Sequence, residues 1–464
     1  MRYSQILIFI SFLLNCSCQT NSNNGLFIKE SSLSAVGFNG QIWDGIDNDI
    51  LQGNYGLMNS VLVIYDNKLI LEKYYNDWTR DKLHDIQSAT KSVTSSLVGI
   101  ALDKGYISSV NQKIVDYFPL QKMDTLKREI TLENMLTMSA GLKWDEESKK
   151  YNEPGNSLTD MYNMRDDWIA YILEQPMSDT PGERFNYNSG ISILLGSIIQ
   201  SSSKMTVPSF AEKYLFQPIG INNYQWVDHF GLTHCGGGLS LSSIDLAKFG
   251  YLYFNNGNWK GNQIISESWI RESLKPRYKS ELKACYGYQW WSIDSLFDLK
   301  TIPYAAGNGW QFVFLIKEFD LIIVFTGKNY GNEELKTTFS PHELLFGILC
   351  SSPKFKDRIL NIYENQSIKP SKNIYEIVVL AYCLNILGEY DKTIDVLNQL
   401  GQEDSDDIRF NFLMGKSYFN TGDLTKAENY LDKCVNACRD QKSPHAGYYN
   451  LANKLIEKMN KNGM

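Results

Sequence analysis

The sequence lacks a long apolar run, an excess of positive charge and the cysteine and histidine spacings of a metal site. Beyond the N-terminal segment no apolar run approaches about 18 residues, so no membrane-spanning helix is expected there. The net charge of −7 argues against nucleic-acid binding, which requires a basic surface. No C-x-x-C pair follows the N-terminal segment, and the five histidines include no H-E-x-x-H. We therefore expect no metal, no cofactor and no nucleic-acid partner.

Signatures of other enzyme sites are also missing. No G-x-S-x-G is present, which argues against the nucleophile elbow of an α/β-hydrolase. Neither a P-loop nor a G-x-G-x-x-G after a strand is present, so nucleotide binding has no support. The composition, 43% apolar and 21% charged, is that of an ordinary globular protein, and 464 residues suffice for one large and one smaller domain.

The N-terminal stretch MRYSQILIFISFLLNCSCQT resembles a bacterial lipoprotein signal, in which a cysteine becomes the lipidated first residue. Its apolar run, Ile6 to Leu14, is too short to span a bilayer. The pattern favours Cys18 as the lipidation site, with Cys16 as the alternative and a plain cleaved signal as a third reading. We expect a signal peptide over residues 1–18, a linker over 19–39, and export to a lipid-anchored location, periplasmic or cell-surface, on a bacterial membrane.

The candidate nucleophile is a serine followed three places later by a lysine. This spacing begins at Ser88, Ser201, Ser280 and Ser351, so the surrounding sequence must decide among the four. Pro353 lies inside the last copy and opposes a helix there. Ser201 ends an apolar segment, and Ser280 lies in a polar stretch. Ser88 alone precedes a run with the apolar spacing of a buried helix, Val93, Leu97, Ile100 and Ala101.

Ser88 is therefore expected at a helix N-terminus, and Gly105 is expected to end that helix. Free backbone N–H groups at such an end stabilise an attacking alkoxide and a tetrahedral oxyanion. Lys91 lies one turn along, where burial and the positive helix end lower the pKa of the amine, which could then act as a base. The alternative is that Ser88 only caps the helix and Lys91 is solvated.

Six stretches in a fixed order carry a family resemblance. They are DIQSATKSVTSSLVGIALDKGYI, ITLENMLTMSAGLKW, PGERFNYNSGISILLGSII, GGGLSLSSIDLAKFGYLYFNNGNWKGNQIIS, YGYQWW and AAGNGWQFVFLIKEFDLIIVFTG. This set resembles the serine beta-lactamase-related family of class C beta-lactamases, D-alanyl-D-alanine carboxypeptidases, esterases and nylon-oligomer amidases. The resemblance implies an α+β fold over residues 40–352, a beta-lactamase/transpeptidase-like domain with an antiparallel sheet, flanking helices and a helical subdomain. It also implies that Ser88 and Lys91 are catalytic.

Tyr187-Asn188-Ser189 resembles the family's Tyr-x-Ser element, which faces the serine. Pro181-Gly182 supplies a turn before it, and the apolar run 191–199 supplies a helix after it. A phenol is a poor base in water, but beside a cationic lysine its phenolate is favoured, so Tyr187 could relay a proton. The resemblance thus implies Tyr187 as a third catalytic residue and Ser189 as a substrate-binding residue.

The third motif of the family, which follows the Ser-x-x-Lys and Tyr-x-Ser motifs, is altered in this chain. Relatives carry Lys-Thr-Gly or a histidine variant on the closing strand, whereas this chain has Ala305-Ala306-Gly307, and the Ser-Asp-Asn of class A beta-lactamases is absent too. Gly307, Asn308 and Gly309 are the expected substrate-binding residues, with an N–H near Asn308 completing an oxyanion hole. In the family, the lysine of this motif helps to hold the carboxylate of beta-lactams and D-Ala-D-Ala peptides. Its absence here disfavours these substrates and favours an uncharged ester or amide.

Other segments complete the expected domains. SVLVIYDNKLILEKYY predicts a hairpin around Asp66-Asn67, which joins the strands near 285–327 in one antiparallel sheet. EESKKYNEPGNSLTDMYNMRDD is loop-like and is expected to border the site. Residues 353–464 predict a small all-α domain, because a shift of 34 residues aligns LGEYDKTIDVL with TGDLTKAENYL, a tetratricopeptide-like period. Two repeats are few for a free solenoid, so they are expected to pack on the hydrolase domain or a partner.

Two functions remain. In the first, the chain is an anchored serine hydrolase that forms an acyl-enzyme on Ser88 with a small-molecule or peptide-like ester or amide. Beta-lactams or D-Ala-D-Ala peptides are then the second substrate class. In the other, the domain is a degenerate scaffold whose helical repeats bind a protein or cell-wall partner. The complete Ser-Lys-Tyr set favours the hydrolase.

Overall fold

The computed structural model describes residues 29–118, 124–164, 167–280, 284–294, 296–297, 299–330, 338–365, 374–401, 407–440 and 446–462. The expected signal peptide, with Cys16 and Cys18, and the first part of the expected linker lie outside these residues. Within them, no helix is both long enough and apolar enough to cross a membrane.

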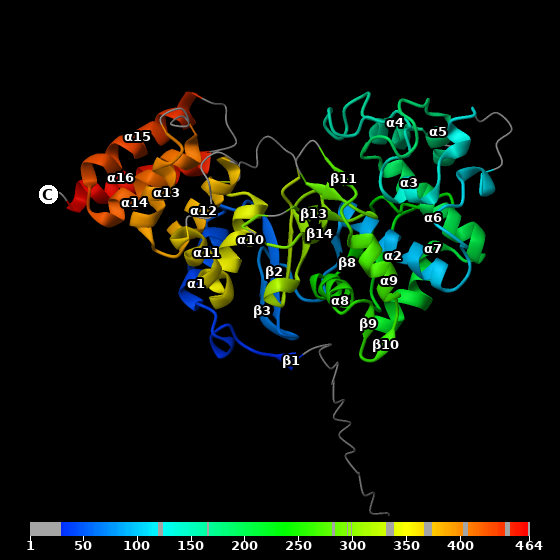
Figure 1. Ribbon diagram of the computed structural model, residues 1–464, viewed down its shortest axis with the longest axis horizontal. Coiled ribbons are helices and arrows are strands. Elements are labelled where there is room, and N and C mark those ends of the chain that lie inside the picture. The colour runs from blue at the N-terminus through cyan, green and yellow to red at the C-terminus, as the bar shows by residue number, and fades with distance from the viewer. Residues whose placement is uncertain are drawn as a thin grey trace, which may run out of the picture.

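A nine-stranded sheet forms the centre of the molecule (Figure 1). In spatial order its strands are β1 (Lys29–Glu30), β3 (Lys68–Tyr74), β2 (Met58–Tyr65), β16 (Leu321–Gly327), β15 (Gln311–Ile316), β14 (Ile302–Gly307), β13 (Trp291–Ile293), β12 (Cys285–Tyr286) and β11 (Tyr278–Lys279). Every neighbouring pair is antiparallel except β1 with β3, which is parallel. The predicted antiparallel sheet is confirmed apart from this short edge strand.

The predicted hairpin is confirmed as β2 and β3, which are joined by Asp66 and Asn67. These two residues have φ values of 47° and 57°. Such left-handed conformations at both central positions are those of a type I′ turn, whose twist matches that of the strands it connects. Asp and Asn tolerate this region better than most residues, so the local sequence determines the turn.

The sheet carries a hydrophobic core on each face. Along β2, Leu62 and Ile64 belong to one core and Val61 and Val63 to the other, as alternating side chains require. The first core joins the sheet to a helical lobe of α2 (Thr90–Asp103), α3 (Leu132–Leu136), α4 (Ser157–Asn163), α5 (Trp168–Glu174), α6 (Ser189–Ser203), α7 (Val207–Ala211), α8 (Ser243–Phe254) and α9 (Glu267–Leu274). The sheet thus lies between this lobe and a second group of helices (Figure 1).

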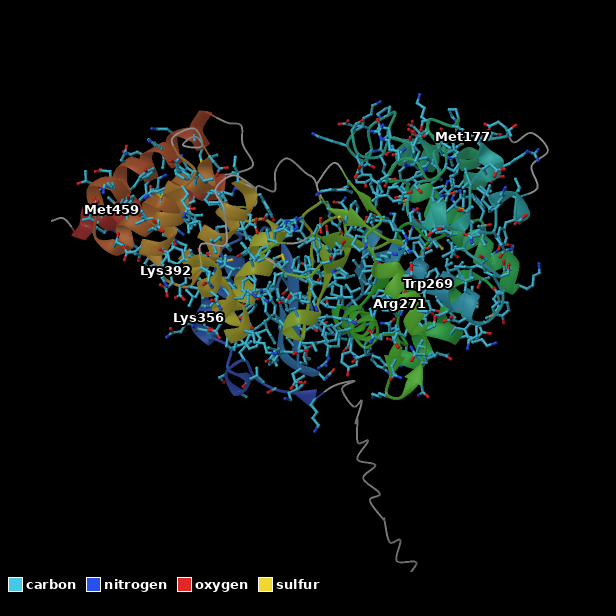
Figure 2. All side chains as sticks on the ribbon, in the orientation of Figure 1. Met177, Trp269, Arg271, Lys356, Lys392 and Met459 are labelled. Carbon is cyan, nitrogen blue, oxygen red and sulfur yellow. The ribbon has the colours of Figure 1, made fainter. Side chains whose placement is uncertain are left out.

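Three smaller sheets are separate from the central one. One has three strands in the order β4 (His84–Asp85), β8 (Leu239–Leu241) and β5 (Gln225–Trp226). The other two are hairpins, β6 (Asp228–His229) with β7 (Leu232–Thr233) and β9 (Asn258–Trp259) with β10 (Asn262–Gln263). Within the lobe, Trp269 of α9, labelled in Figure 2, packs closely against α2. A Cβ atom at Gly99 would lie 2.4 Å from the indole, so only glycine allows this approach.

The second core contains the C-terminal helices as well as the sheet. Its helices are α1 (Gly40–Leu51), α10 (Pro341–Ser351), α11 (Pro353–Glu364), α12 (Ile374–Ile386), α13 (Tyr390–Asn398), α14 (Ile408–Thr421), α15 (Leu424–Asp440) and α16 (Ala446–Asn462). Buried hydroxyls reinforce the junction, because Tyr382 donates to Glu343 O at 3.1 Å and Tyr448 donates to Glu343 Oε1 at 2.8 Å. The helices therefore pack on the hydrolase domain, which was one of the two predicted outcomes.

The 34-residue period matches two helix pairs, α12–α13 and α14–α15. Gly388 and Gly422, equivalent in the period, have φ values of 78° and 90° and end the first helix of each pair. A Cβ at Gly415 would lie 2.6 Å from the Leu431 side chain, so α14 and α15 approach closely. That these pairs form a tetratricopeptide-like domain stays a prediction.

The shared core predicts that the C-terminal helices stabilise the whole protein. Leu384 of α12 is fully buried in this core, so Leu384→Ala should cost about 2–5 kcal/mol of unfolding free energy. All ten tryptophans precede residue 353, so urea unfolding followed by tryptophan fluorescence reports on the hydrolase domain alone. The half-exposed Leu424 provides the control, since Leu424→Ala should change stability by less than about 0.5 kcal/mol. An unchanged fluorescence midpoint in Leu384→Ala would show that the two parts unfold independently.

Candidate active site

Ser88 lies in a single turn of 3-10 helix, Gln87–Ala89, immediately before α2. Gln87 has a φ of 49°, a left-handed conformation that is costly for a non-glycine residue. The carboxylate of Asp85 holds it there, accepting from Gln87 N at 2.8 Å and from Gln87 Nε2 at 2.6 Å. The predicted helix is confirmed, including its end, where Gly105 has a φ of 74°.

Lys91 is buried, with only 2% of its surface exposed. Its Nζ donates to Ser88 Oγ at 3.0 Å and to Gly236 O at 2.6 Å. Burial lowers the pKa of Lys91 to about 8, and the negative charge of Glu146 acts in the opposite direction. The alternative of a solvated lysine is therefore wrong, and so is the capping role of Ser88, because no side chain caps α2.

Two of the other three copies of the serine–lysine spacing lack this arrangement. Lys204, the partner of Ser201, is exposed, and the side chain of Lys354, the partner of Ser351, is 48% exposed and pairs with Asp320. The lysine that follows Ser280 lies outside the described residues. Burial of the lysine thus separates Ser88 from the copies whose lysine the structure describes.

Tyr187 completes the cluster from the segment before α6. Its ring centroid lies 4.8 Å from Lys91 Nζ, and the Ser88 side chain is close enough to affect the pKa of the Tyr187 hydroxyl. Trp291 stacks on the ring at 5.6 Å, and Asn188 caps α6 by accepting from its third N–H. Tyr187 therefore lies on a loop just before the N-terminus of α6, as predicted, and the ring of Trp291, which was not predicted, packs against it.

The protonation of Tyr187 differs from the expectation. Burial raises the pKa of Tyr187 well above its usual value, and the charge of Glu146 adds to this effect, while the Ser88 side chain opposes it. Desolvation of the anion outweighs any attraction to the neighbouring lysine, so the neutral phenol is the stable form. Tyr187 is thus better suited to donate a proton than to act as a resting phenolate.

Glu146 is a member of the site that sequence reasoning missed. Only 3% of it is exposed, and it accepts from Ser189 Oγ at 2.6 Å and from Ser189 N at 2.8 Å. It belongs to the segment predicted to be a loop, which in fact also contains α4, capped by Asn156. An acidic residue without periodic context carries no signal of burial, although the prediction that this segment borders the site could have pointed to it.

The substrate-binding candidates lie on both sides of Ser88. Ser189 is buried and its hydroxyl is directed to Glu146. Gly307, the last residue of β14, packs closely on the backbone just before the 3-10 turn Gln87–Ala89, since a Cβ at Gly307 would lie 2.2 Å from Ile86 O. Asn308 is the next residue and is partly buried. Gly309 has a φ of 80°, packs on the Tyr330 ring and forms an isolated antiparallel β-bridge with Asn329. Substrate contacts of these four residues remain a prediction.

Comparison with known proteins gives the family of the chain. Residues 57–337 match the family described as Beta-lactamase. The 6-aminohexanoate-dimer hydrolase of Paenarthrobacter ureafaciens is 21% identical over 255 residues, which are 50% of this chain and 64% of that enzyme, so the chain spans less than two thirds of it.

Among solved structures, a family VIII carboxylesterase superposes with a TM-score of 0.53 at 15% identity, covering 68% of this chain and 97% of its own. The beta-lactamase/D-alanine carboxypeptidase of Pseudomonas syringae superposes with a TM-score of 0.51 at 17% identity, covering 67% and 98%. At these identities the superpositions show the fold alone. The family match spans more than half of the residues, and the chain therefore belongs to the beta-lactamase family of serine hydrolases.

Proposed function

We propose that this protein is an exported, lipid-anchored hydrolase that cleaves an uncharged ester or amide through an acyl-enzyme on Ser88. The observation that carries the proposal is the hydrogen bond of 3.0 Å between buried Lys91 Nζ and Ser88 Oγ. A serine hydroxyl is a weak nucleophile until a base accepts its proton. Lys91, with a pKa of about 8, has a substantial neutral fraction near neutral pH and can be that base.

The proposed reaction has two stages. In the first, Lys91 takes the Ser88 proton while it still donates to Gly236 O, and the alkoxide attacks the carbonyl carbon. Tyr187, as a neutral phenol, gives its proton to the departing alkoxide or amine and is reprotonated through Lys91. In the second, water attacks the acyl-enzyme by the reverse proton path and releases the acid. Backbone N–H groups of Ser88 and Asn308 are the proposed oxyanion donors.

The substrate class follows from the altered third motif. Ala305 stands where relatives carry the cation that helps to hold a substrate carboxylate. Asp85, which lies in β4 just before the 3-10 turn Gln87–Ala89, acts electrostatically on Tyr330 beside Gly309. The missing cation, together with this nearby acid, disfavours a carboxylate-bearing substrate, which supports a neutral ester or amide over a beta-lactam.

Export and anchoring rest on the N-terminal pattern, with Cys18 or Cys16 as the lipidated residue. Two acyl chains on such a cysteine would suffice for stable membrane attachment. The C-terminal helices, which complete the second core, are proposed to stabilise the hydrolase, and their tetratricopeptide-like pairs could additionally bind a protein partner.

Covalent labelling by a fluorophosphonate tests the proposal without knowledge of the substrate. The probe should add one mass increment to the protein from residue 25 onward, and Ser88→Ala should not be labelled. If the probe labels Ser88, the unlabelled enzyme should then be screened against p-nitrophenyl esters and small anilides before beta-lactams. A folded, unlabelled protein would contradict the proposal and support instead the scaffold function, for which a pull-down through the C-terminal helices is the next experiment.

A further inference from the structure

We propose that Glu146 is a positioning residue of this site, which fixes Ser189 and Gly236 around Lys91 and supplies the counter-charge of the lysine. The inference rests on the proposed function of Ser88 and Lys91, and adds a buried carboxylate outside the three predicted catalytic residues. Its support is a continuous set of contacts that begins at Glu146 and ends at Lys91 Nζ.

The carboxylate of Glu146 is fully engaged. Besides its two bonds from Ser189, it accepts from Trp144 Nε1 at 2.9 Å and from Tyr151 OH at 3.3 Å. Four donors surround a carboxylate that is only 3% exposed, so protein hydrogen bonds replace the water that the group loses on burial. One donor, Ser189 N, belongs to the first residue of the 15-residue helix α6, whose dipole also favours a negative charge there.

Ser189 transmits this arrangement to the lysine. A Cβ atom at Gly236 would lie 2.6 Å from Ser189 O, so the two backbones are in direct contact, and only glycine permits the approach. Gly236 O in turn accepts from Lys91 Nζ at 2.6 Å. Since the Glu146–Ser189 bonds hold one side of this contact, loss of the carboxylate would release the carbonyl that orients Lys91.

The negative charge of Glu146 also acts on Lys91. It raises the pKa of Lys91 against the effect of burial. The other titratable groups facing Lys91 are Tyr187 and His234, and those facing Glu146 are Tyr151, Tyr162, Tyr187 and Tyr286. Burial holds the pKa of His234 near 4 and the pKa values of the four phenols above their usual range, so these groups are neutral at neutral pH. Glu146 is the negative member of the set.

The test is the pH dependence of fluorophosphonate labelling, measured as a second-order rate constant for wild type and Glu146→Gln. In wild type the rate should rise with pH through the pKa of Lys91, about 8, because only the neutral amine is a base. Without the opposing carboxylate the lysine loses its proton more readily. The midpoint in Glu146→Gln should therefore move to lower pH, by on the order of one unit, and the plateau rate should fall because Ser189 is released.

Two matched variants separate the electrostatic effect of Glu146 on Lys91 from its role in positioning Ser189. Ser189→Ala keeps the carboxylate and removes its shortest bond, so the plateau should fall with the midpoint unchanged. Glu147→Gln removes a charge from the exposed neighbouring position and should leave both unchanged. If Glu146→Gln does not fold, Glu146→Asp replaces it: this variant keeps the charge on a shorter side chain, and should lower the plateau without moving the midpoint.

Each outcome is decisive. A lower plateau in Glu146→Gln with the wild-type midpoint would overturn the electrostatic part of the proposal, and a wild-type plateau in Glu146→Asp or Ser189→Ala would overturn the positioning part. Labelled wild type with unaffected variants would reject this inference while the proposed function stands. Unlabelled wild type would reject both.

Discussion

Replacing Ser88 by alanine should abolish ester and amide turnover, with a loss of at least about 10⁴-fold in kcat, while the fold is retained. The physical reason is that Ser88 carries the hydroxyl that accepts from Lys91 Nζ, and alanine leaves no oxygen there to attack the carbonyl carbon. The half-buried side chain makes no helix cap, so its loss should change stability by less than about 1 kcal/mol. Hydrolysis of a p-nitrophenyl ester gives the rate, and thermal unfolding by circular dichroism gives the stability.

Ser95 offers a matched control in the same helix. It is fully buried in α2, and its hydroxyl has no hydrogen-bond partner among the described residues. Because an unsatisfied buried hydroxyl is a cost, Ser95→Ala should be neutral or slightly stabilising, with wild-type turnover. Turnover above about one per cent of wild type in Ser88→Ala would exclude Ser88 as the nucleophile.

Replacing Lys91 by methionine should reduce turnover nearly as much as Ser88→Ala, by about 10³-fold or more, because the nucleophile and its base act as a unit. Methionine fills much of the volume of the lysine stem, so the buried position stays packed. The change leaves Gly236 O without its donor, at a cost of about 1–3 kcal/mol, and removes a buried amine that must be desolvated. Stability is therefore expected to change little.

Lys91→Arg separates the base from the positive charge. A guanidinium stays protonated in proteins and cannot accept the Ser88 proton, so this variant should be as inactive as Lys91→Met. The double replacement of Ser88 and Lys91 should be no slower than Ser88→Ala alone. Substantial activity in Lys91→Arg would show that the lysine acts through its charge and not as a base.

The sequence predicted those parts of the site that have a local pattern. Ser88 and Lys91 are one helical turn apart, and the apolar spacing after them places that turn in a buried helix. The hairpin at Asp66-Asn67 and the helix after Tyr187 have equally local signals, a turn pair and a cap followed by an apolar run. In each case the residues that determine the structure are neighbours in the chain.

The parts that were missed depend on contacts between distant segments. Glu146 and Ser189 meet only because the segment before α4 folds against the start of α6, and no periodicity in either segment predicts this contact. The expected phenolate at Tyr187 failed for the same reason. A single attractive neighbour can be read from sequence, whereas the burial that outweighs it comes from Trp291 and Tyr286, more than ninety residues away along the chain.

The pairing of strands in the central sheet also limits how early in synthesis the protein can fold. Val61 of β2 pairs with Phe325 of β16, so the middle of the sheet joins two segments at nearly opposite ends of the hydrolase domain. Closing so long a loop costs entropy before its contacts form, and such non-local pairing folds slowly. An unfinished chain that ends before β16 would contain Ser88, Lys91 and Tyr187 but would lack the strand that joins β2 to β15, and would expose one edge of the apolar strand β2 to aggregation. Since β16 ends at Gly327, we expect catalytic competence to arise only after synthesis has passed this residue, and chains that terminate upstream of it to be inactive.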